Sequence, residues 1–263
     1  MCTRAGIRLA ALLLAATCGI ATLAHADTGD GCGAATRAIV AQLKPVAPPA
    51  RKIDVSRMVC KAWPGKADTL LAAVPLMQQL DADDNTGDLE MLVLDRHTSR
   101  VRQRLLLPNL MSDGAVRIDR LTLDTARYQL APATRAFALR IHRTGSSRVN
   151  PFSEMELQLF VVRDNQLVRV LDGLVTAQDG GEWDGECAGD FSSTSRTLSM
   201  DGQAHHGYHD ITVNSRKEAS SSTLDKQGNC VDGPRAVSSQ QARLRFDGTR
   251  YEVPAPLKPL DDD

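Results

Sequence analysis

The sequence predicts an all-β fold with one short N-terminal helix, in which mainly antiparallel strands form a sandwich-like or curved sheet. Apolar and polar residues alternate along many short segments, which is typical of strands with one buried face. Turn-forming residues separate these segments, and no long helical pattern lies between them, so a parallel sheet with crossover helices is disfavoured. An α+β fold is the alternative.

The composition is that of a folded globular protein and narrows the classes of partner. The chain has 263 residues, of which 42% are hydrophobic and 24% are charged. Only 4% are aromatic, and the formal net charge is −1. Nucleic-acid binding is therefore disfavoured, because it usually needs a basic surface and aromatic stacking platforms.

The helix is predicted over Ala34–Leu43. Ala35, Ile39 and Leu43 recur at every fourth position, as on one face of a helix, and the pattern stops just before a proline at position 45. The proline-rich segment 44–52 that follows is expected to be an extended connector.

After this connector the pattern changes to the two-residue period of strands. A slip in the alternation at Asp119 and Arg120 predicts a bulge or a bend. The serine- and glycine-rich segment 180–232 shows little alternation and is the hardest to assign. The expected strands are Thr69–Met77, Leu89–Asp95, Val101–Leu107, Val116–Asp124, Arg135–Arg143, Met155–Arg163, Leu167–Ala177, His209–Ser215, Ala242–Phe246 and Thr249–Val253.

The first 26 residues have the pattern of a secretory signal peptide. Arg4 and Arg8 precede an apolar stretch that ends at Ala24-His25-Ala26, a cleavage site with small residues at both key positions. We therefore expect cleavage after Ala26 and a periplasmic or secreted mature protein. No later segment approaches the length of a membrane span, so none is expected in the mature chain.

Cleavage would also change the charge and the cysteine count. Losing the two arginines lowers the formal net charge from −1 to −3.

Lipid attachment at Cys18 is the alternative to cleavage after Ala26, but the residues before this cysteine lack the leucine that lipid-modified sites usually have. Residues 27–256 are expected to form a single disulfide-stapled β-rich domain, and residues 257–263 an acidic flexible tail.

Four cysteines remain in the mature chain, and an even number in an exported protein predicts two disulfides. Three connectivities are possible, and the shorter separations within each half of the chain favour Cys32 with Cys60 and Cys187 with Cys230. No Cys-x-x-Cys motif or short ligand spacing occurs, so thiol-redox chemistry and a cysteine zinc site are disfavoured.

An acidic loop offers the one cofactor site that the sequence suggests. Asp81, Asp83, Asn85 and Asp88 supply oxygen atoms at spacings that suit calcium. Thr86 stands where such loops usually have glycine, so a solvated acidic turn is the alternative. No other cofactor is predicted.

Arginines concentrate in segment 96–148, which has eleven arginines against three carboxylates. Arg100, Arg102 and Arg104 are expected to share one face of a strand. Such a face can bind an anionic partner, because guanidinium groups grip carboxylates and phosphates. An ordinary solvent face paired with acidic loops is the alternative.

Two further groups of residues have the types found in active sites. Three carboxylates alternate around a tryptophan, as paired acids of a hydrolase require, and three histidines cluster in a glycine-flanked loop that could ligate zinc or copper. A polar loop is the alternative for the histidines, and no serine-nucleophile or phosphate-loop motif accompanies either group. These residues are Glu182, Asp184 and Glu186, and His205, His206 and His209.

These patterns favour a non-enzymatic periplasmic or secreted protein that binds a protein or an anionic component of the cell envelope. A hydrolase that acts on an envelope polymer is the alternative function.

Overall fold

Two antiparallel sheets and one helix make up most of the structure. It is a computed structural model that describes residues 32–43, 51–80 and 85–259. The predicted all-β fold with one short helix is confirmed. The helices are α1 (Ala35–Leu43) and the short 3₁₀ helix η1 (Ala255–Leu257). The strands, in chain order, are β1 (Lys52–Ile53), β2 (Val59–Ala62), β3 (Thr69–Met77), β4 (Thr86–Asp95), β5 (Val101–Ser112), β6 (Val116–Ala131), β7 (Thr134–Gly145), β8 (Phe152–Arg163), β9 (Gln166–Trp183), β10 (Gly189–His205), β11 (Tyr208–Leu224), β12 (Cys230–Asp232) and β13 (Ala236–Leu244).

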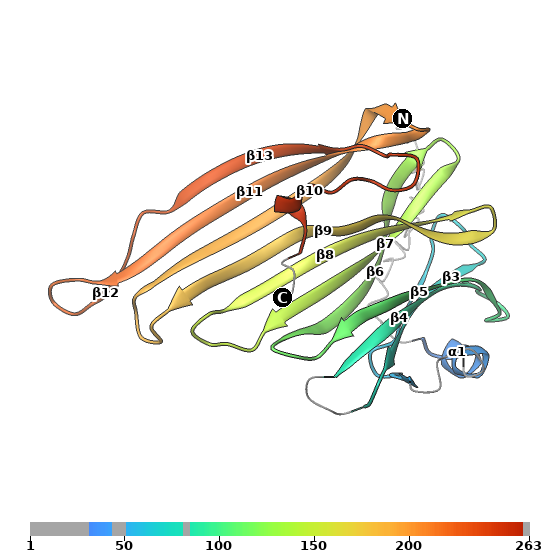
Figure 1. The fold of residues 1–263 in the computed structure, drawn as a ribbon, viewed down its shortest axis with the longest axis horizontal. Coiled ribbons are helices and arrows are strands. Elements are labelled where there is room, and N and C mark those ends of the chain that lie inside the picture. The colour runs from blue at the N-terminus through green and yellow to red at the C-terminus, as the bar shows by residue number, and fades with distance from the viewer. Residues whose placement is uncertain (1–31, 44–50, 81–84, 260–263) are drawn as a thin grey trace, which may run out of the picture.

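The strands divide into a smaller and a larger sheet (Figure 1). The smaller sheet has five strands in the order β1, β3, β4, β5, and β2 also pairs with β3. The larger sheet has eight strands in the order β12, β11, β10, β9, β8, β7, β6, and β13 also pairs with β11. The register of β6 against β7 shifts between Ile118 and Arg120, which confirms the predicted bulge.

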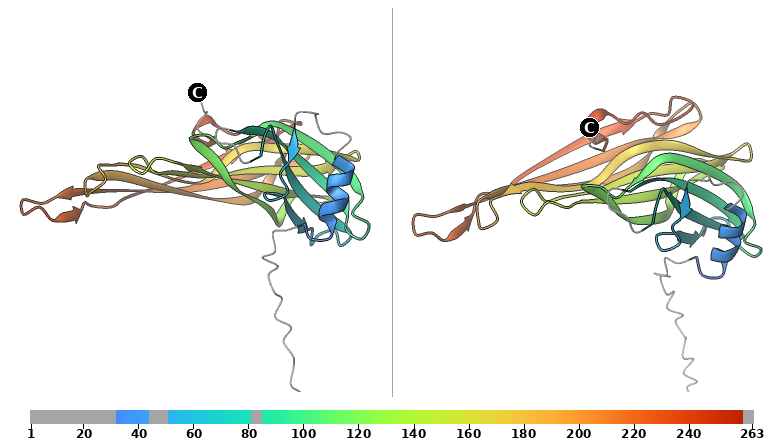
Figure 2. Two further views of the ribbon diagram at one scale, coloured as in Figure 1. Left: turned by 90° about the horizontal axis from the view of Figure 1, so that it is seen from below. Right: turned by 60° about the horizontal axis from the view of Figure 1, so that its bottom comes forward.

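Apolar side chains stack the helix and the two sheets into layers (Figure 2). Ile39 and Leu43 of α1 pack on one face of the smaller sheet. The other face packs on the larger sheet through a core that includes Leu71 and Phe137. Because β3 is covered on both faces, nearly all its side chains are buried, which explains its continuous apolar run.

A C-terminal segment, residues 246–259, completes the larger sheet. Strands β9 and β10 pair only from Ala177 to Trp183 of β9, and beyond that the C-terminal segment lies between them. The Tyr251 N–H donates to the Val170 carbonyl of β9 at 2.7 Å, and the Arg196 guanidinium of β10 donates to the Pro256 carbonyl at 3.4 Å.

Two expected strands near the C-terminus need correction. Residues 249–253 form no strand, because they contact β9 and Phe246 through isolated backbone bonds instead of a ladder. The strand expected over residues 242–246 is the end of β13, which begins at Ala236.

Strands β10 to β13 form a region that we call the arm. Its far end projects beyond the layered part of the molecule as a single sheet (Figure 2). Segment 180–232, in which the sequence predicted only the strand 209–215, forms most of it. Serine- and threonine-rich strands suit such a position, because no residue of β10 is fully buried and no apolar alternation is required.

The predicted disulfide pairing is confirmed. Cys32 and Cys60 join the start of α1 to β2, with Cα atoms 4.9 Å apart, and Cys187 and Cys230 join the β9–β10 turn to β12, with Cα atoms 5.6 Å apart. Two such bonds indicate an oxidising compartment outside the cytoplasm. In the part of the chain that the structure describes, no helix has the length and apolarity needed to span a bilayer.

Several sequence-based expectations concern residues near the two ends of the chain. The signal peptide with Cys18, most of the connector and the last four residues of the acidic tail lie outside the described residues. Leu257, at the start of the expected tail, is buried against the larger sheet.

Candidate functional site

A large polar cleft lies between the end of β5, strands β7 to β9 and the C-terminal segment. Its volume is about 990 Å³, against about 430 Å³ for a cavity on the arm side of the larger sheet. Residues 108–110 of β5 form one side, and Arg243, Arg245 and residues 250–259 form the other. Few apolar side chains line it, so its chemistry is set by charge.

The floor of the cleft continues the apolar core along the same faces of two strands. On β7, Arg143 follows Phe137, Leu139 and Ile141 at two-residue intervals, so all four share a face. On β8 the corresponding row reads Phe160, Gln158, Glu156, Glu154. The core therefore gives way to charged and polar side chains where the smaller sheet no longer covers it.

Hydrogen bonds join these floor residues into one chain. The Arg143 guanidinium contacts Glu156 Oε2 at 2.5 Å, and Gln158 Nε2 donates to Glu156 Oε1 at 2.7 Å. Arg169 of β9 donates to Gln158 Oε1 at 3.3 Å and pairs with Asp172 at 2.8 Å. Both Glu156 and Gln158 are buried, and the chain satisfies polar groups that would otherwise be costly there.

The pKa of Asp172 reflects the burial and the charges of the cleft. Burial raises the pKa of its carboxyl above the usual value, and Glu156 acts in the same direction. Arg169, Arg250 and Lys258 oppose this effect, since their positive charges favour the carboxylate. The cations on the C-terminal wall thus face the same space as the floor.

Three cations on that wall make no direct salt bridge. The side chains of Arg245, Arg250 and Lys258 are exposed, and none forms an ion pair with a described residue. Arg250 and Lys258 interact with Asp172 only through longer-range attraction. In all, six cationic side chains and three carboxylates line the cleft. An anion entering it would meet three cationic groups that no described carboxylate contacts directly.

The predicted arginine face is partly neutralised by neighbouring acids. Arg102 is paired with Asp95, and Arg104 Nε lies 2.6 Å from Glu90 Oε1, a buried carboxylate on β4. Arg100 has no ion pair with the described residues. The three side chains are thus placed near one another, but two of them serve pairs within the smaller sheet.

The predicted calcium ligands that the structure describes have structural partners. Asp88 accepts two hydrogen bonds from Arg51 and one from the Asn109 N–H. The Asn85 side chain bonds the backbone of Gln79 in both directions. Asp81 and Asp83 lie outside the described residues. Within those residues no group of three or more His, Cys, Asp or Glu side chains is arranged to hold a metal ion.

The histidine cluster is dispersed around the β10–β11 turn. His205 Nδ1 lies 2.6 Å from Asp210 Oδ1, and this carboxylate is fully buried. His206 occupies the turn itself with a positive φ of 48°. The His209 carbonyl accepts a hydrogen bond from Tyr251 Oη at 2.6 Å. The cluster therefore anchors the base of the arm.

The carboxylate triplet lies at the β9–β10 turn near the arm disulfide. Asp184 accepts hydrogen bonds from the N–H groups of Glu186, Cys187 and Ala188, which lower the pKa of its carboxyl. Its oxygens shape the turn that presents Cys187 to Cys230. Glu182 and Glu186 make no ion pair with the described residues.

The sequence analysis did not identify the cleft, although Arg143 falls in the arginine-rich segment. The sequence does contain a trace of the wall. Arg243 and Arg245 alternate with the buried residues Leu244 and Phe246, as on a strand with one exposed, basic face. Only the return of the C-terminal segment to β9 brings the wall opposite Glu156 and Asp172.

Comparisons with protein-family models, with curated proteins and with solved structures gave no match. Function is therefore argued from the geometry of this chain alone.

Proposed function

We propose that this protein is a non-enzymatic binding protein of the periplasm or the extracellular medium and that it holds an anionic partner in the cleft. The observation that carries the proposal is the set of three cations, Arg245, Arg250 and Lys258, that line a cleft of about 990 Å³ and make no direct salt bridge with a described residue. An oxidising destination agrees with the two disulfides.

The partner is an anionic component of the cell envelope, and binding is mainly electrostatic. Long-range attraction accelerates the encounter, and charge-assisted hydrogen bonds orient the bound group. The hydrogen-bonded chain from Arg143 to Asp172 keeps the floor fixed, so the exposed side chains of the wall are the ones that adapt to the ligand.

The test uses a linear polyphosphate as the anionic probe and follows binding by titration calorimetry. The triple variant Arg245→Gln, Arg250→Gln, Lys258→Gln should weaken binding by about tenfold or more, since each exposed charge-assisted contact contributes about 0.5–1 kcal/mol. Added salt should weaken binding to the unmodified protein and affect the variant less.

The matched control is Arg117→Gln, Arg127→Gln, Arg148→Gln. These arginines are exposed and lack ion pairs with the described residues, so the control changes the net charge by the same amount outside the cleft. Equal losses in the two triple variants would show that binding depends on net charge alone and would refute the cleft. Turnover of an envelope polymer by the purified protein would refute the non-enzymatic role.

A further inference from the structure

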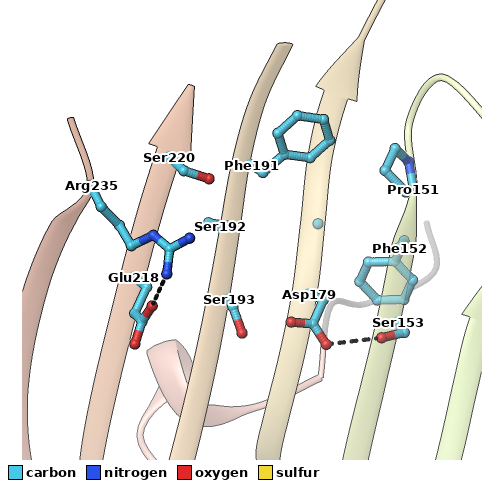
Figure 3. Close-up of a pocket in the computed structure, with 11 residues that line it drawn as sticks. Pro151, Phe152, Ser153, Asp179, Phe191, Ser192, Ser193, Glu218, Ser220 and Arg235 are labelled. Carbon is cyan, nitrogen blue, oxygen red and sulfur yellow. Dashed lines mark hydrogen bonds and ion pairs between the residues drawn. The ribbon is translucent and has the colours of Figure 1, made fainter. Parts of the chain in front are cut away.

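A second cavity, of about 430 Å³, lies on the arm side of the larger sheet across β8 to β11 (Figure 3). Cross-strand register places Ser153, Asp179, Ser193 and Glu218 side by side on four successive strands. Two residues farther along three of these strands, and therefore on the same face, are Gly181, Phe191 and Ser220. We call this cavity the arm groove.

Two glycines, Gly181 and Gly189, determine how the ring of Phe191 packs in the groove. A Cβ atom at Gly181 would lie 2.6 Å from Phe191 Cδ1, and one at Gly189 would lie 3.0 Å from Cε2 of the same ring. The absence of both Cβ atoms lets the ring pack against the backbone of β9 and β10. Figure 3 shows the ring over β9, between β10 and Pro151. The ring therefore contributes an apolar wall to the groove.

The charged wall of the groove has one carboxylate without a counter-ion. Asp179 accepts a hydrogen bond from Ser153 Oγ at 3.3 Å and makes no ion pair with the described residues. Glu218 already pairs with Arg216 at 2.7 Å and with Arg235 at 3.8 Å. An incoming positive charge would thus be matched by Asp179 and not by Glu218.

The surroundings of the groove favour the same sign of ligand. Segment 179–190 has five acidic residues and no lysine or arginine, and none of the five carboxylates forms an ion pair with a described residue. This local field is opposite to that of the cleft. It attracts cations toward the groove, whose one lining cation, Arg235, lies 3.8 Å from Glu218.

We propose that the arm groove binds a small organic cation with a methylated ammonium group. The methyl groups would pack on Phe191 and Pro151, and the positive charge would face the ring and the Asp179 carboxylate. A ring face attracts a cation through its quadrupole, and methylation reduces the hydration that a bare ammonium would lose. The site is independent of the anionic cleft, because the two are lined by different residues.

The test uses choline as the probe and follows backbone amide shifts of the full mature protein by NMR. Saturable shifts at Gly180, Gly181 and Ser192 are expected, with a dissociation constant of about 1–10 mM for so small a ligand. Phe191→Leu keeps an apolar side chain and Asp179→Asn keeps its shape, and each should weaken binding about two- to fivefold.

Two controls separate cation recognition from other causes. Glu186→Gln removes a charge from the same acidic segment away from the groove and should leave choline binding unchanged within twofold. The neutral analogue, in which a tert-butyl group replaces the trimethylammonium group, should not bind measurably.

The proposal is overturned if the neutral analogue binds as well as choline, if choline gives no saturable shift up to about 50 mM, or if Glu186→Gln weakens binding as much as Asp179→Asn. Melting curves of each variant confirm folding. The choline titration contains no polyphosphate, and the two sites share no lining residue, so a negative result here does not bear on the proposal for the cleft.

Discussion

The layered region and the arm are built from the same kind of strand but are stabilised differently. Nearly every residue of β3 and β4 is buried, because the smaller sheet is covered by α1 on one face and by the larger sheet on the other. Strand β10 has no buried residue along its length, and β13 buries only Leu244. The arm therefore gains little from the hydrophobic effect beyond its base.

The difference shows what can replace a core. The arm has long backbone ladders, and β11 pairs with β13 over nine residues. It also has a disulfide that joins the β9–β10 turn to β12. A disulfide stabilises mainly by restricting the unfolded chain, so it does not need apolar surface. Folding stability is thus concentrated in the layers, while the arm depends on covalent and backbone bonds.

The largest expected effect is in the layered core. Phe137 is fully buried, with its ring centroid 5.2 Å from that of Trp63 and 5.6 Å from that of Phe160. Phe137→Ala should lower the free energy of unfolding by about 3–5 kcal/mol in chemical denaturation. Leu198→Ala, on the half-buried side of β10, should cost about 1 kcal/mol. Similar losses would show that the arm has a core of comparable strength.

Removing the arm disulfide should have the next largest effect, and it should be local. Cys187→Ser with Cys230→Ser frees a connection of 43 residues, for which the chain-entropy model gives about 2–4 kcal/mol. Amide hydrogen exchange should speed up in residues 189–196 and 216–224, while amides of β3 and β7 stay protected. Uniform acceleration across both regions would show that the arm and the layers unfold as one unit.

The smallest effect is a dependence on acid. Burial tends to raise the pKa of Asp124, but hydrogen bonds from Tyr128 Oη, the Ala126 N–H and the Arg140 guanidinium lower it by more. A lowered pKa in the folded state adds stability above pH of about 4, and this is lost as pH falls through the folded pKa.

Asp124→Asn should therefore remove about 1 kcal/mol at neutral pH and flatten the decline in stability on acidification. Asp190→Asn is the matched change in the arm, where the carboxyl is exposed and makes no ion pair with the described residues. Urea unfolding at several pH values should show the larger change for Asp124→Asn, and the reverse order would contradict the comparison.

Sequence reasoning succeeded where one face of an element is buried. The stripe Ala35, Ile39, Leu43 predicted the helix, and its three residues are the buried ones. The disulfide pairing and the bulge near Asp119 followed from spacing and from a phase slip, both local properties of the chain.

It failed where burial does not mark the pattern or where distant segments meet. Strand β10 has one exposed and one only half-buried face, and Ser192 to Ser199 place mostly polar side chains on both, so they show no apolar alternation. The cleft combines residues of β5, β7, β8, β9 and the C-terminal segment, and no local pattern reports that Lys258 faces Asp172. The arginine face that the sequence did suggest lost part of its charge to acids on β4, which only tertiary structure reveals.

The return of the C-terminal segment to β9 has a consequence for the order of events in biogenesis. The bond from Tyr251 to Val170 joins residues far apart in the chain, and contacts of such high sequence separation form late. The wall of the cleft includes residues of this C-terminal segment, so the cleft is complete only once this long-range contact has formed. Under the proposed function, the protein would bind its partner only after this slow step of folding.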